Sequence, residues 1–211
     1  MSRFEVVLFD FDGTVADTGE GVLSSVRYAL EKTGVIPPGE EVLRKFIGPT
    51  LYRSFRDLIG LDREASLKAI DLYREYYIPH GVYMCKLYEG MEETLCALKE
   101  SGYKLSIASA KPQRQLEIAV NHLGITHYFD KIVGADPSSI SNDKDYILEQ
   151  AKLSDRVVMV GDSPFDMQAA KRLGFDTIAV LYGFSSEQVM SAENPTFTAQ
   201  DCNEIRKILI D

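Results

Sequence analysis

The chain of 211 residues has no tryptophan, three cysteines and three histidines, and it has no extended run of lysine or arginine. Cys85, Cys96 and Cys202 are an odd number without C-x-x-C spacing, which argues against a disulfide framework or a zinc site and favours reduced thiols. The histidines are scattered without metal-ligand spacing, so we assign them no catalytic role. A net charge of −9 without a basic stretch argues against nucleic acid and anionic membranes as partners.

Long apolar runs are also missing. No stretch is long enough to span a bilayer, and the first residues do not resemble a secretory leader, so we expect a cytoplasmic protein. Repeats and low-complexity segments are absent, and 45% hydrophobic with 26% charged residues is enough for a sizeable core. A chain of this length suits one domain with an insertion, or one large and one small domain. We expect a monomer or a homodimer.

The most informative segment is residues 6–14, where an unbroken apolar run ends in two acids and a Gly-Thr pair. Such a run is typical of a strand buried on both faces, and carboxylates beside a core are costly unless a cation or a reaction needs them. Asp10 and Asp12 leave an extended chain on the same face, so both can address one ligand. Gly13 permits a sharp turn, and the Thr14 hydroxyl can bind a phosphate-like oxygen or cap that turn.

Strand-like and helix-like segments alternate along most of the chain. Four further short apolar runs are predicted strands, at residues 104–109, 131–133, 157–161 and 177–181. The amphipathic stretches among them are predicted helices, at residues 92–101, 112–123, 144–152 and 164–173. This alternation predicts an α/β fold with a five-stranded parallel sheet that has helices on both faces.

Residues 18–83 interrupt the alternation, because their apolar positions recur at helical spacing only. A helical segment inserted after the first strand cannot join the sheet, so we predict a small helical domain at 18–83 and a core formed by 1–17 and 84–211. Within the insertion, Gly48 and the following Pro49 form a turn that leads into a helix at Thr50. The free amides of that helix start, together with Arg53, can meet a substrate anion, and a plain turn with a solvated arginine is the alternative.

Polar residues also follow two of the later predicted strands. Ser109 stands beside a predicted helix start, where it can bind phosphate or simply cap the helix. Asp162 and Asp166 are four apart after another buried strand, so a turn can bring both to one cation such as Mg²⁺, which prefers oxygen ligands. Clustered carboxylates and a phosphate repel one another, and a lysine would offset this. Lys144 is our choice for that lysine, and Lys111 is the competitor.

These segments resemble the four motifs of the haloacid dehalogenase superfamily, and they occur in the same order: D-F-D-G-T at 10–14, I-A-S-A-K-P at 107–112, Lys144, and G-D-S-P-F-D at 161–166. The resemblance implies that Asp10 is a nucleophile that attacks phosphorus. It also implies that Asp12 is a general acid and base whose backbone carbonyl helps to hold Mg²⁺. The presence of the second acid favours phosphoryl transfer over carbon–halogen cleavage.

The later motifs complete the implied site. By the same resemblance, Ser109 and Lys144 bind the phosphoryl group, and Asp162 and Asp166 hold Mg²⁺ directly or through water. The lysine motif of the superfamily usually reads Lys-Pro, whereas this chain has an aspartate at position 145. The resemblance further implies a Rossmann-like core with a helical cap inserted after the first strand.

The segments F-I-G-P-T-L at 46–51 and V-L-Y-G-F-S-S-E at 180–187 resemble the phosphoglycolate phosphatase-like branch of the superfamily. We therefore expect a Mg²⁺-dependent phosphatase that acts through an aspartyl-phosphate on a small phosphorylated metabolite such as 2-phosphoglycolate. A 5′-nucleotidase or a pyrophosphatase of the same family is the alternative. A non-catalytic protein that binds a phosphorylated ligand is an alternative of another class, although such a protein would normally have lost one of the acids.

Overall fold

The computed structural model describes residues 3–48, 50–136 and 143–210. The contacts between Cα atoms divide the chain into two compact units. We call Met1–Asp17 with Lys86–Asp211 the sheet unit, and Thr18–Cys85 the helical unit. Among the described residues, no helix combines the length and the apolar character that a membrane crossing requires.

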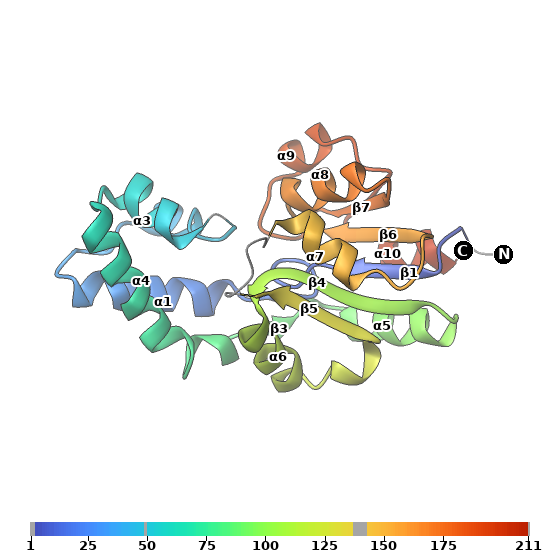
Figure 1. The fold of residues 1–211 in the computed structure, drawn as a ribbon, viewed down its shortest axis with the longest axis horizontal. Helices are drawn as coiled ribbons and strands as arrows, with labels where there is room; N and C mark the ends of the chain where they lie inside the picture. The colour runs from blue at the N-terminus through green and yellow to red at the C-terminus, as the bar shows by residue number, and fades with distance from the viewer. Residues whose placement is uncertain (1–2, 49, 137–142, 211) are drawn as a thin grey trace. The chain divides into compact units, whose positions relative to one another are not determined.

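The sheet unit is built on a six-stranded parallel sheet with the order β5-β4-β1-β6-β7-β8 (Figure 1). The strands are β1 (Val6–Phe9), β4 (Lys104–Pro112), β5 (Lys131–Ala135), β6 (Val157–Gly161), β7 (Asp176–Val180) and β8 (Phe197–Ala199). This confirms the predicted α/β fold, but the sheet has six strands rather than five. The additional strand, β8, lies at the edge of the sheet and buries only Ala199 of its three residues, so it has almost no hydrophobic pattern.

Helices cover both faces of this sheet. The helices of the sheet unit are α5 (Met91–Glu100), α6 (Gln113–His122), α7 (Lys144–Ala151), α8 (Pro164–Arg172), α9 (Glu187–Ala192) and α10 (Cys202–Ile210), with a 3-10 turn η2 (Thr126–Tyr128). Along the chain, β4 and β5 are added to the sheet on one side of β1. The chain then crosses back, and β6, β7 and β8 are added on the other side. Because such crossovers are right-handed, α5 and α6 lie on the opposite face from α7 and α8.

Successive side chains of β1 point to opposite faces of the sheet. Val6 and Leu8 pack into one buried cluster with Ile147 and Leu148 of α7. The intervening side chains face the other way, and Phe9 meets Phe129 edge-to-face there at 6.4 Å between ring centroids. The first strand is therefore buried on both faces, as its unbroken apolar run predicts.

The location of the candidate site follows from the strand order, because the chain fills the sheet on one side of β1 and then on the other. In an open sheet of this kind, ligands bind outside the carboxyl ends of the strands at the point where the connections diverge. Phe9 lies level with Ile107 of β4 and Val160 of β6, so the next residues of all three strands emerge at one edge. The pairing of β4 with β5 shifts between Ala108 and Pro112, and an irregularity of this kind re-aims the side chains between them.

The helical unit contains α1 (Gly19–Lys32), α2 (Glu40–Arg44), α3 (Leu51–Ile59), α4 (Arg63–Tyr77) and a 3-10 turn η1 (Gly81–Tyr83). Tyr73 and Tyr77 of α4 are buried and stacked, with ring centroids 5.2 Å apart. Gly21 of α1 lies so close to the backbone of Gly81 that a Cβ atom at position 21 would overlap the carbonyl of residue 81. Aromatic packing and this close backbone approach hold the unit together.

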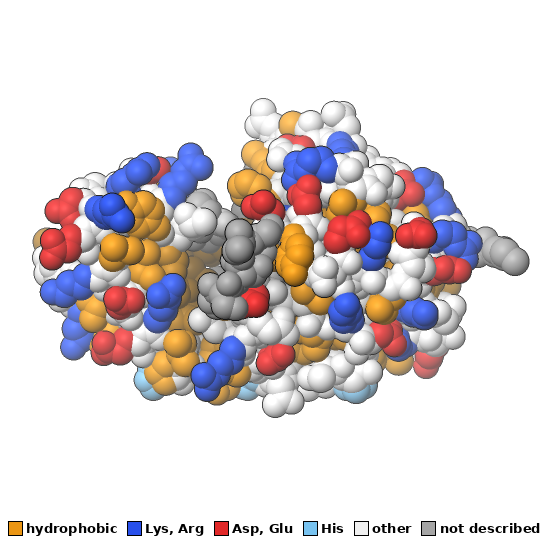
Figure 2. All heavy atoms as spheres, viewed as in Figure 1, with side chains coloured by type: hydrophobic (Ala, Val, Ile, Leu, Met, Phe, Trp, Pro, Cys, Tyr) orange, Lys and Arg blue, Asp and Glu red, His pale blue; other side chains and the backbone are white. Residues whose placement is uncertain are grey.

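A short antiparallel pair marks the points where the chain leaves and re-enters the sheet unit. Strand β2 (Ala16–Asp17) pairs with β3 (Lys86–Leu87), and Asp17 lies opposite Lys86. On the face of the sheet unit seen in Figure 2, acidic and basic side chains of described residues are interspersed. A nucleic-acid-binding face typically has lysines and arginines clustered in a basic patch, and this face has no such patch among the described residues.

Candidate active site

Three buried carboxylates meet at the carboxyl edge of the sheet. Asp10 follows β1, Asp162 follows β6, and Asp166 lies in the first turn of α8. One oxygen of each lies within 4.8 Å of the others, and all three residues are buried. The structure thus brings together three of the predicted site residues in an arrangement that could hold a divalent metal ion.

Lys144 is the counter-charge of this cluster. Its Nζ lies 2.6 Å from Oδ1 of Asp10 and 2.7 Å from Oδ1 of Asp166, and it donates to the carbonyl of Ala108 at 2.7 Å. An ammonium has three N–H donors, and these three acceptors use all of them. Between the two candidate lysines, the structure places Lys144 rather than Lys111 on Asp10.

The cluster carries an excess of negative charge. Three carboxylates against one ammonium leave two unbalanced negative charges when all four groups are ionised. Burial, together with the charge of Asp166, raises the pKa of Asp10 to about 7, although Lys144 opposes the rise. Burial and then the charges of Asp10 and Asp166 raise the pKa of Asp162 to about 8. Burial disfavours the charged form of Lys144, but Asp10 and Asp166 outweigh it and raise the pKa of the lysine. A bound cation would relieve this repulsion.

Asp162 is held by neutral donors rather than by a lysine among the described residues. The backbone N–H of Phe184 donates to its Oδ2 at 2.7 Å, and the Thr14 hydroxyl donates to its Oδ1 at 3.4 Å. Gly13 has φ +88°, and a Cβ atom there would overlap Asp162 and the Phe184 ring. The carbonyl of Thr14 accepts from the Tyr182 hydroxyl at 2.9 Å. Thr14 is fully buried, so its hydroxyl serves Asp162 in this structure.

Sequence reasoning did not assign Phe184 or Tyr182 to the site. Both belong to the V-L-Y-G-F-S-S-E segment. That segment indicated the resemblance to one branch of the superfamily, but it did not predict any contact in the site. The donor of Phe184 is a backbone N–H, which every non-proline residue has, so its side chain gives no sign of this role. A glycine at position 183 is the one local signal, because a Cβ atom there would overlap Asp162.

Asp166 is fixed by a capping box at the start of α8. The Ser163 hydroxyl donates to Oδ2 of Asp166 at 2.7 Å, and the Ser163 N–H donates to the same oxygen at 3.2 Å. In return, the Asp166 N–H donates to the Ser163 Oγ at 3.3 Å. Since Oδ1 binds Lys144, both oxygens of Asp166 have partners.

Asp12 and Ser109 stand on the β4 side of the site. Lys111 binds both oxygens of Asp12, with its Nζ 2.9 Å from Oδ1 and 3.2 Å from Oδ2. The Asp12 side chain is 29% exposed, whereas the Lys111 side chain is 5% exposed. Ser109 is buried, and its Oγ accepts from the Lys111 N–H at 3.3 Å. Asp12 is therefore the more accessible of the two acids in the D-F-D-G-T motif.

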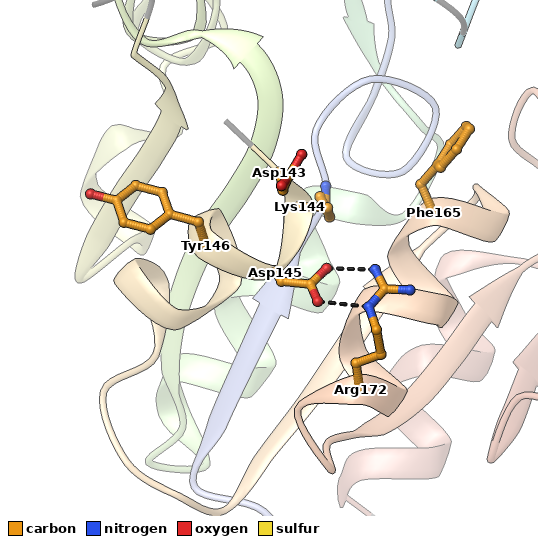
Figure 3. Close-up of a pocket in the computed structure, with 6 residues that line it drawn as sticks. All are labelled: Asp143, Lys144, Asp145, Tyr146, Phe165 and Arg172. Carbon is orange, nitrogen blue, oxygen red and sulfur yellow. Dashed lines mark hydrogen bonds and ion pairs between the residues drawn. The ribbon is translucent and has the colours of Figure 1, made fainter. Parts of the chain in front are cut away.

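A groove of about 490 Å³ runs beside Lys144, lined also by Asp143, Asp145, Tyr146, Phe165 and Arg172 (Figure 3). Asp145 stands where the related motif has proline, and it receives two bonds from Arg172, at 2.7 and 2.5 Å. Tyr146 and Phe165 point away from this ion pair. The pair ties the start of α7, which carries Lys144, to the end of α8.

The three other predicted residues lie in the helical unit. Gly48 has φ +107°, and Thr50 is the exposed residue that precedes α3. Arg53 is in the first turn of α3, exposed, with its Nε 3.4 Å from Oδ2 of Asp57. Pro49, which belongs to the predicted turn, lies outside the described residues. An exposed helix start with an arginine in its first turn can meet an anion.

Comparison with known proteins identifies what this chain is similar to. The sequence model of a family described as haloacid dehalogenase-like hydrolase matches residues 7–180. A 5′-nucleotidase of Pseudomonas aeruginosa is 31% identical over 98% of this chain and 96% of its own length. A phosphoglycolate phosphatase of Vibrio parahaemolyticus is 27% identical over 97% of this chain and 96% of its own. The crystal structure of a provisionally named phosphatase from Clostridium difficile superposes with a TM-score of 0.91, at 33% identity, over 100% of both chains.

Proposed function

Since the chain belongs to the haloacid dehalogenase-like hydrolases, as a phosphatase of that family, we propose that it is a Mg²⁺-dependent phosphomonoesterase that forms an aspartyl-phosphate on Asp10. The membership confirms the resemblance seen in its motifs. The observation that carries the proposal is the buried meeting of Asp10, Asp162 and Asp166 around one lysine. Such a cluster is costly without a ligand that uses it.

The residues present fit a magnesium ion. The donors are carboxylate oxygens, and the N–H and O–H donors on Asp162 leave it without a protein cation among the described residues. We assign Asp10, Asp162, Asp166 and the backbone carbonyl of Asp12 to hold the ion. When bound, Mg²⁺ supplies positive charge that reduces the repulsion between the phosphate and these acids.

In the first half of the reaction, a carboxylate oxygen of Asp10 forms a bond to phosphorus and the bond to the leaving oxygen breaks. Asp12, which is more exposed than Asp10, gives a proton to that leaving oxygen. The Ser109 hydroxyl donates to one oxygen of the phosphoryl group, and the Lys144 ammonium exchanges one of its three acceptors for another phosphoryl oxygen. The location of the four side chains at the carboxyl edge of the sheet supports these assignments.

In the second half, Asp12 takes a proton from a water molecule whose oxygen attacks the phosphorus of the aspartyl-phosphate. The bond between phosphorus and the Asp10 oxygen breaks, and inorganic phosphate leaves. We assign Thr14 to the positioning of Asp162 in place of a phosphate contact, because its buried hydroxyl donates to that carboxylate.

We propose that the helical unit serves as a cap that excludes bulk water and selects the substrate. Its exposed helix start, with Gly48, Thr50 and Arg53, supports a substrate that carries a second anionic group. A small phosphorylated metabolite such as 2-phosphoglycolate has a carboxylate of this kind. The similarity to a phosphoglycolate phosphatase along nearly the whole chain supports the same choice.

A nucleoside 5′-monophosphate is the second candidate substrate. The observation in its favour is the 5′-nucleotidase relative, which is more similar at 31% identity than the phosphoglycolate phosphatase at 27%. Pyrophosphate is a third compound to include, because it also carries a second anionic group. The proposed mechanism applies to each of these candidate substrates, because they differ only in the group that leaves from phosphorus.

The test is phosphate release from a panel of phosphorylated compounds with and without Mg²⁺, comparing the wild type with Asp10→Asn. The panel holds 2-phosphoglycolate, nucleoside 5′-monophosphates, pyrophosphate, sugar phosphates and 4-nitrophenyl phosphate. We expect activity that requires Mg²⁺ and falls by at least about a thousandfold in the variant. Activity of Asp10→Asn equal to that of the wild type would show that the nucleophile is assigned wrongly.

A further inference from the structure

The proposed reaction assigns no role to Lys111, which forms an ion pair with Asp12. Asp12 is the acid and base, and Lys144 supplies the counter-charge of Asp10 and Asp166. Lys111 nevertheless binds both oxygens of Asp12, at 2.9 and 3.2 Å. A lysine that contacts both oxygens restricts the orientation of the carboxylate more than a contact to one oxygen would.

The position of Lys111 is itself tightly determined. Its N–H donates to the Ser109 Oγ at 3.3 Å, and the proline at position 112 restricts its backbone to extended conformations. On the neighbouring strand, Gly134 lies so close that a Cβ atom there would stand 2.7 Å from the Lys111 carbonyl oxygen. The Lys111 side chain is 5% exposed, and its ammonium lies 5.9 Å from the centre of the Phe11 ring. A lysine held in this way loses little further freedom when it orients a partner.

The contacts with Lys111 leave room for water at the Asp12 carboxyl group. A carboxylate has about four lone-pair sites, so contacts to Lys111 leave sites for water. The 29% exposure of the Asp12 side chain shows that solvent can reach it.

We infer that Lys111 is a positioning residue that orients the Asp12 carboxylate for hydrolysis of the aspartyl-phosphate; this rests on the function proposed above. In that step the oxygen of water bonds to phosphorus, and one water proton passes to Asp12. The bond between phosphorus and Asp10 breaks, its electrons return to the Asp10 carboxylate, and inorganic phosphate leaves. Asp12 then holds the proton that the leaving oxygen of the next substrate receives.

The test separates the two halves of the reaction with 4-nitrophenyl phosphate. Its leaving group departs as a phenolate without a proton, so formation of the aspartyl-phosphate does not need Asp12. Rapid mixing records the burst of phenolate, and acid quenching records the decay of covalently bound phosphate. The variants are Lys111→Met, Lys111→Gln and Lys111→Arg, each in the full-length protein with Mg²⁺. Lys99→Met is the matched control, because Lys99 forms an ion pair with Asp130 at 2.8 Å within the same unit and outside the site.

We expect Lys111→Met and Lys111→Gln to slow the decay of the aspartyl-phosphate by about tenfold or more, with the burst rate within about threefold of the wild type. Lys111→Arg recovers part of the decay rate, because it keeps a cation at this position. In a background of Asp12→Asn, Lys111→Met has no further effect, because the residue it positions is gone. Lys99→Met matches the wild type in both rates.

Other outcomes would overturn the inference. An equal loss in burst and decay indicates a general structural role, and unchanged decay indicates no role. A further loss in the Asp12→Asn background indicates that Lys111 contacts the phosphate or the water itself. The proposed function is tested separately by Asp10→Asn. An inactive Asp10→Asn together with normal decay in Lys111→Met refutes only the role of Lys111, and wild-type protein that never carries covalent phosphate refutes both.

Discussion

The carboxylates of the site differ in the set of donors that each one receives, and this difference affects what each residue can do. Asp10 contacts an ammonium, while Asp166 is shared between that ammonium and a serine cap. Asp162 receives a backbone N–H and a threonine hydroxyl, which orient it without neutralising its charge. Because no lysine or arginine among the described residues pairs with Asp162, a bound metal ion would supply the positive charge that favours its ionised form.

Gly13 offers a test at the residue scale. An alanine there would be strained at φ +88°, and its Cβ would overlap Asp162 and Phe184. We expect Gly13→Ala to lower the free energy of unfolding by about 1–3 kcal/mol and to weaken Mg²⁺ binding. Urea unfolding and a Mg²⁺ titration measure the two effects.

Gly102 provides the matched control for this prediction. It has almost the same φ, +87°, but a Cβ atom there would meet nothing within 4 Å. Gly102→Ala therefore carries the backbone strain without the overlap, and its Mg²⁺ affinity stays at the wild-type value. Equal effects of the two substitutions on Mg²⁺ binding would contradict the role of Gly13 as the space in which Asp162 fits.

At the scale of elements, the ends of helices and the irregularity in β4 determine where the side chains lie. The first turn of α8 delivers Asp166, the first residue of α7 delivers Lys144, and the irregular end of β4 delivers Lys111. Regular strands bring the chain to the edge of the sheet. The caps and the irregularity then aim the functional groups.

The cap of α8 is expected to act on both stability and metal binding. Ser163→Ala removes the side-chain cap and the donor to Asp166, so we expect a loss of about 1 kcal/mol and weaker Mg²⁺ binding. Ser186 caps α9 by accepting from the Val189 N–H, and no site carboxylate depends on it. Thermal melts should show a similar loss for Ser186→Ala, and a Mg²⁺ titration should show no change. Weaker Mg²⁺ binding in Ser186→Ala would argue against a specific effect of Ser163.

Gly134 tests the irregular end of β4. An added Cβ would stand 2.7 Å from the Lys111 carbonyl oxygen and 2.7 Å from the Gln113 Cα, so the two strands must separate. We expect Gly134→Ala to lower the free energy of unfolding by about 1–3 kcal/mol and to slow turnover, because Lys111 moves with its backbone. Urea unfolding and steady-state hydrolysis of 4-nitrophenyl phosphate measure this. Turnover that stays at the wild-type rate despite a stability loss would show that the site tolerates the shift.

For the whole molecule, the buried acids make stability depend on pH. The pKa of Asp10 is raised to about 7 and that of Asp162 to about 8, against about 4 in an unfolded chain. The metal-free folded protein therefore keeps protons that the unfolded chain releases, so its stability falls as the pH rises from about 4 to about 8. Mg²⁺ binds the ionised form and is expected to raise the melting temperature more at pH 8 than at pH 5.5. Thermal melts with EDTA or Mg²⁺ at both pH values decide this, and an equal gain at the two would contradict the shifted pKa values.

The sequence predicts the sheet and the acids better than the contacts that complete the site. The strands at 6–9 and 157–161 are buried at every residue, and acids follow each directly, so both were visible as patterns. The edge strand β8 was missed because its three residues bury only one side chain. The donor to Asp162 was missed because it is a backbone N–H from a distant loop. The pairing of Lys111 with Asp12 joins residues 99 positions apart, and no local pattern encodes it.

The pairing of β2 with β3 has a consequence for how such proteins diversify. The chain leaves the sheet unit at Asp17 and returns at Lys86, and these residues are direct partners across the ribbon. The two junctions of the insertion therefore lie side by side, so a segment of another length or origin can be spliced between them without drawing the strands apart. With the cap role proposed above, exchange of this segment would change substrate selection and leave the strands of the sheet unit in place.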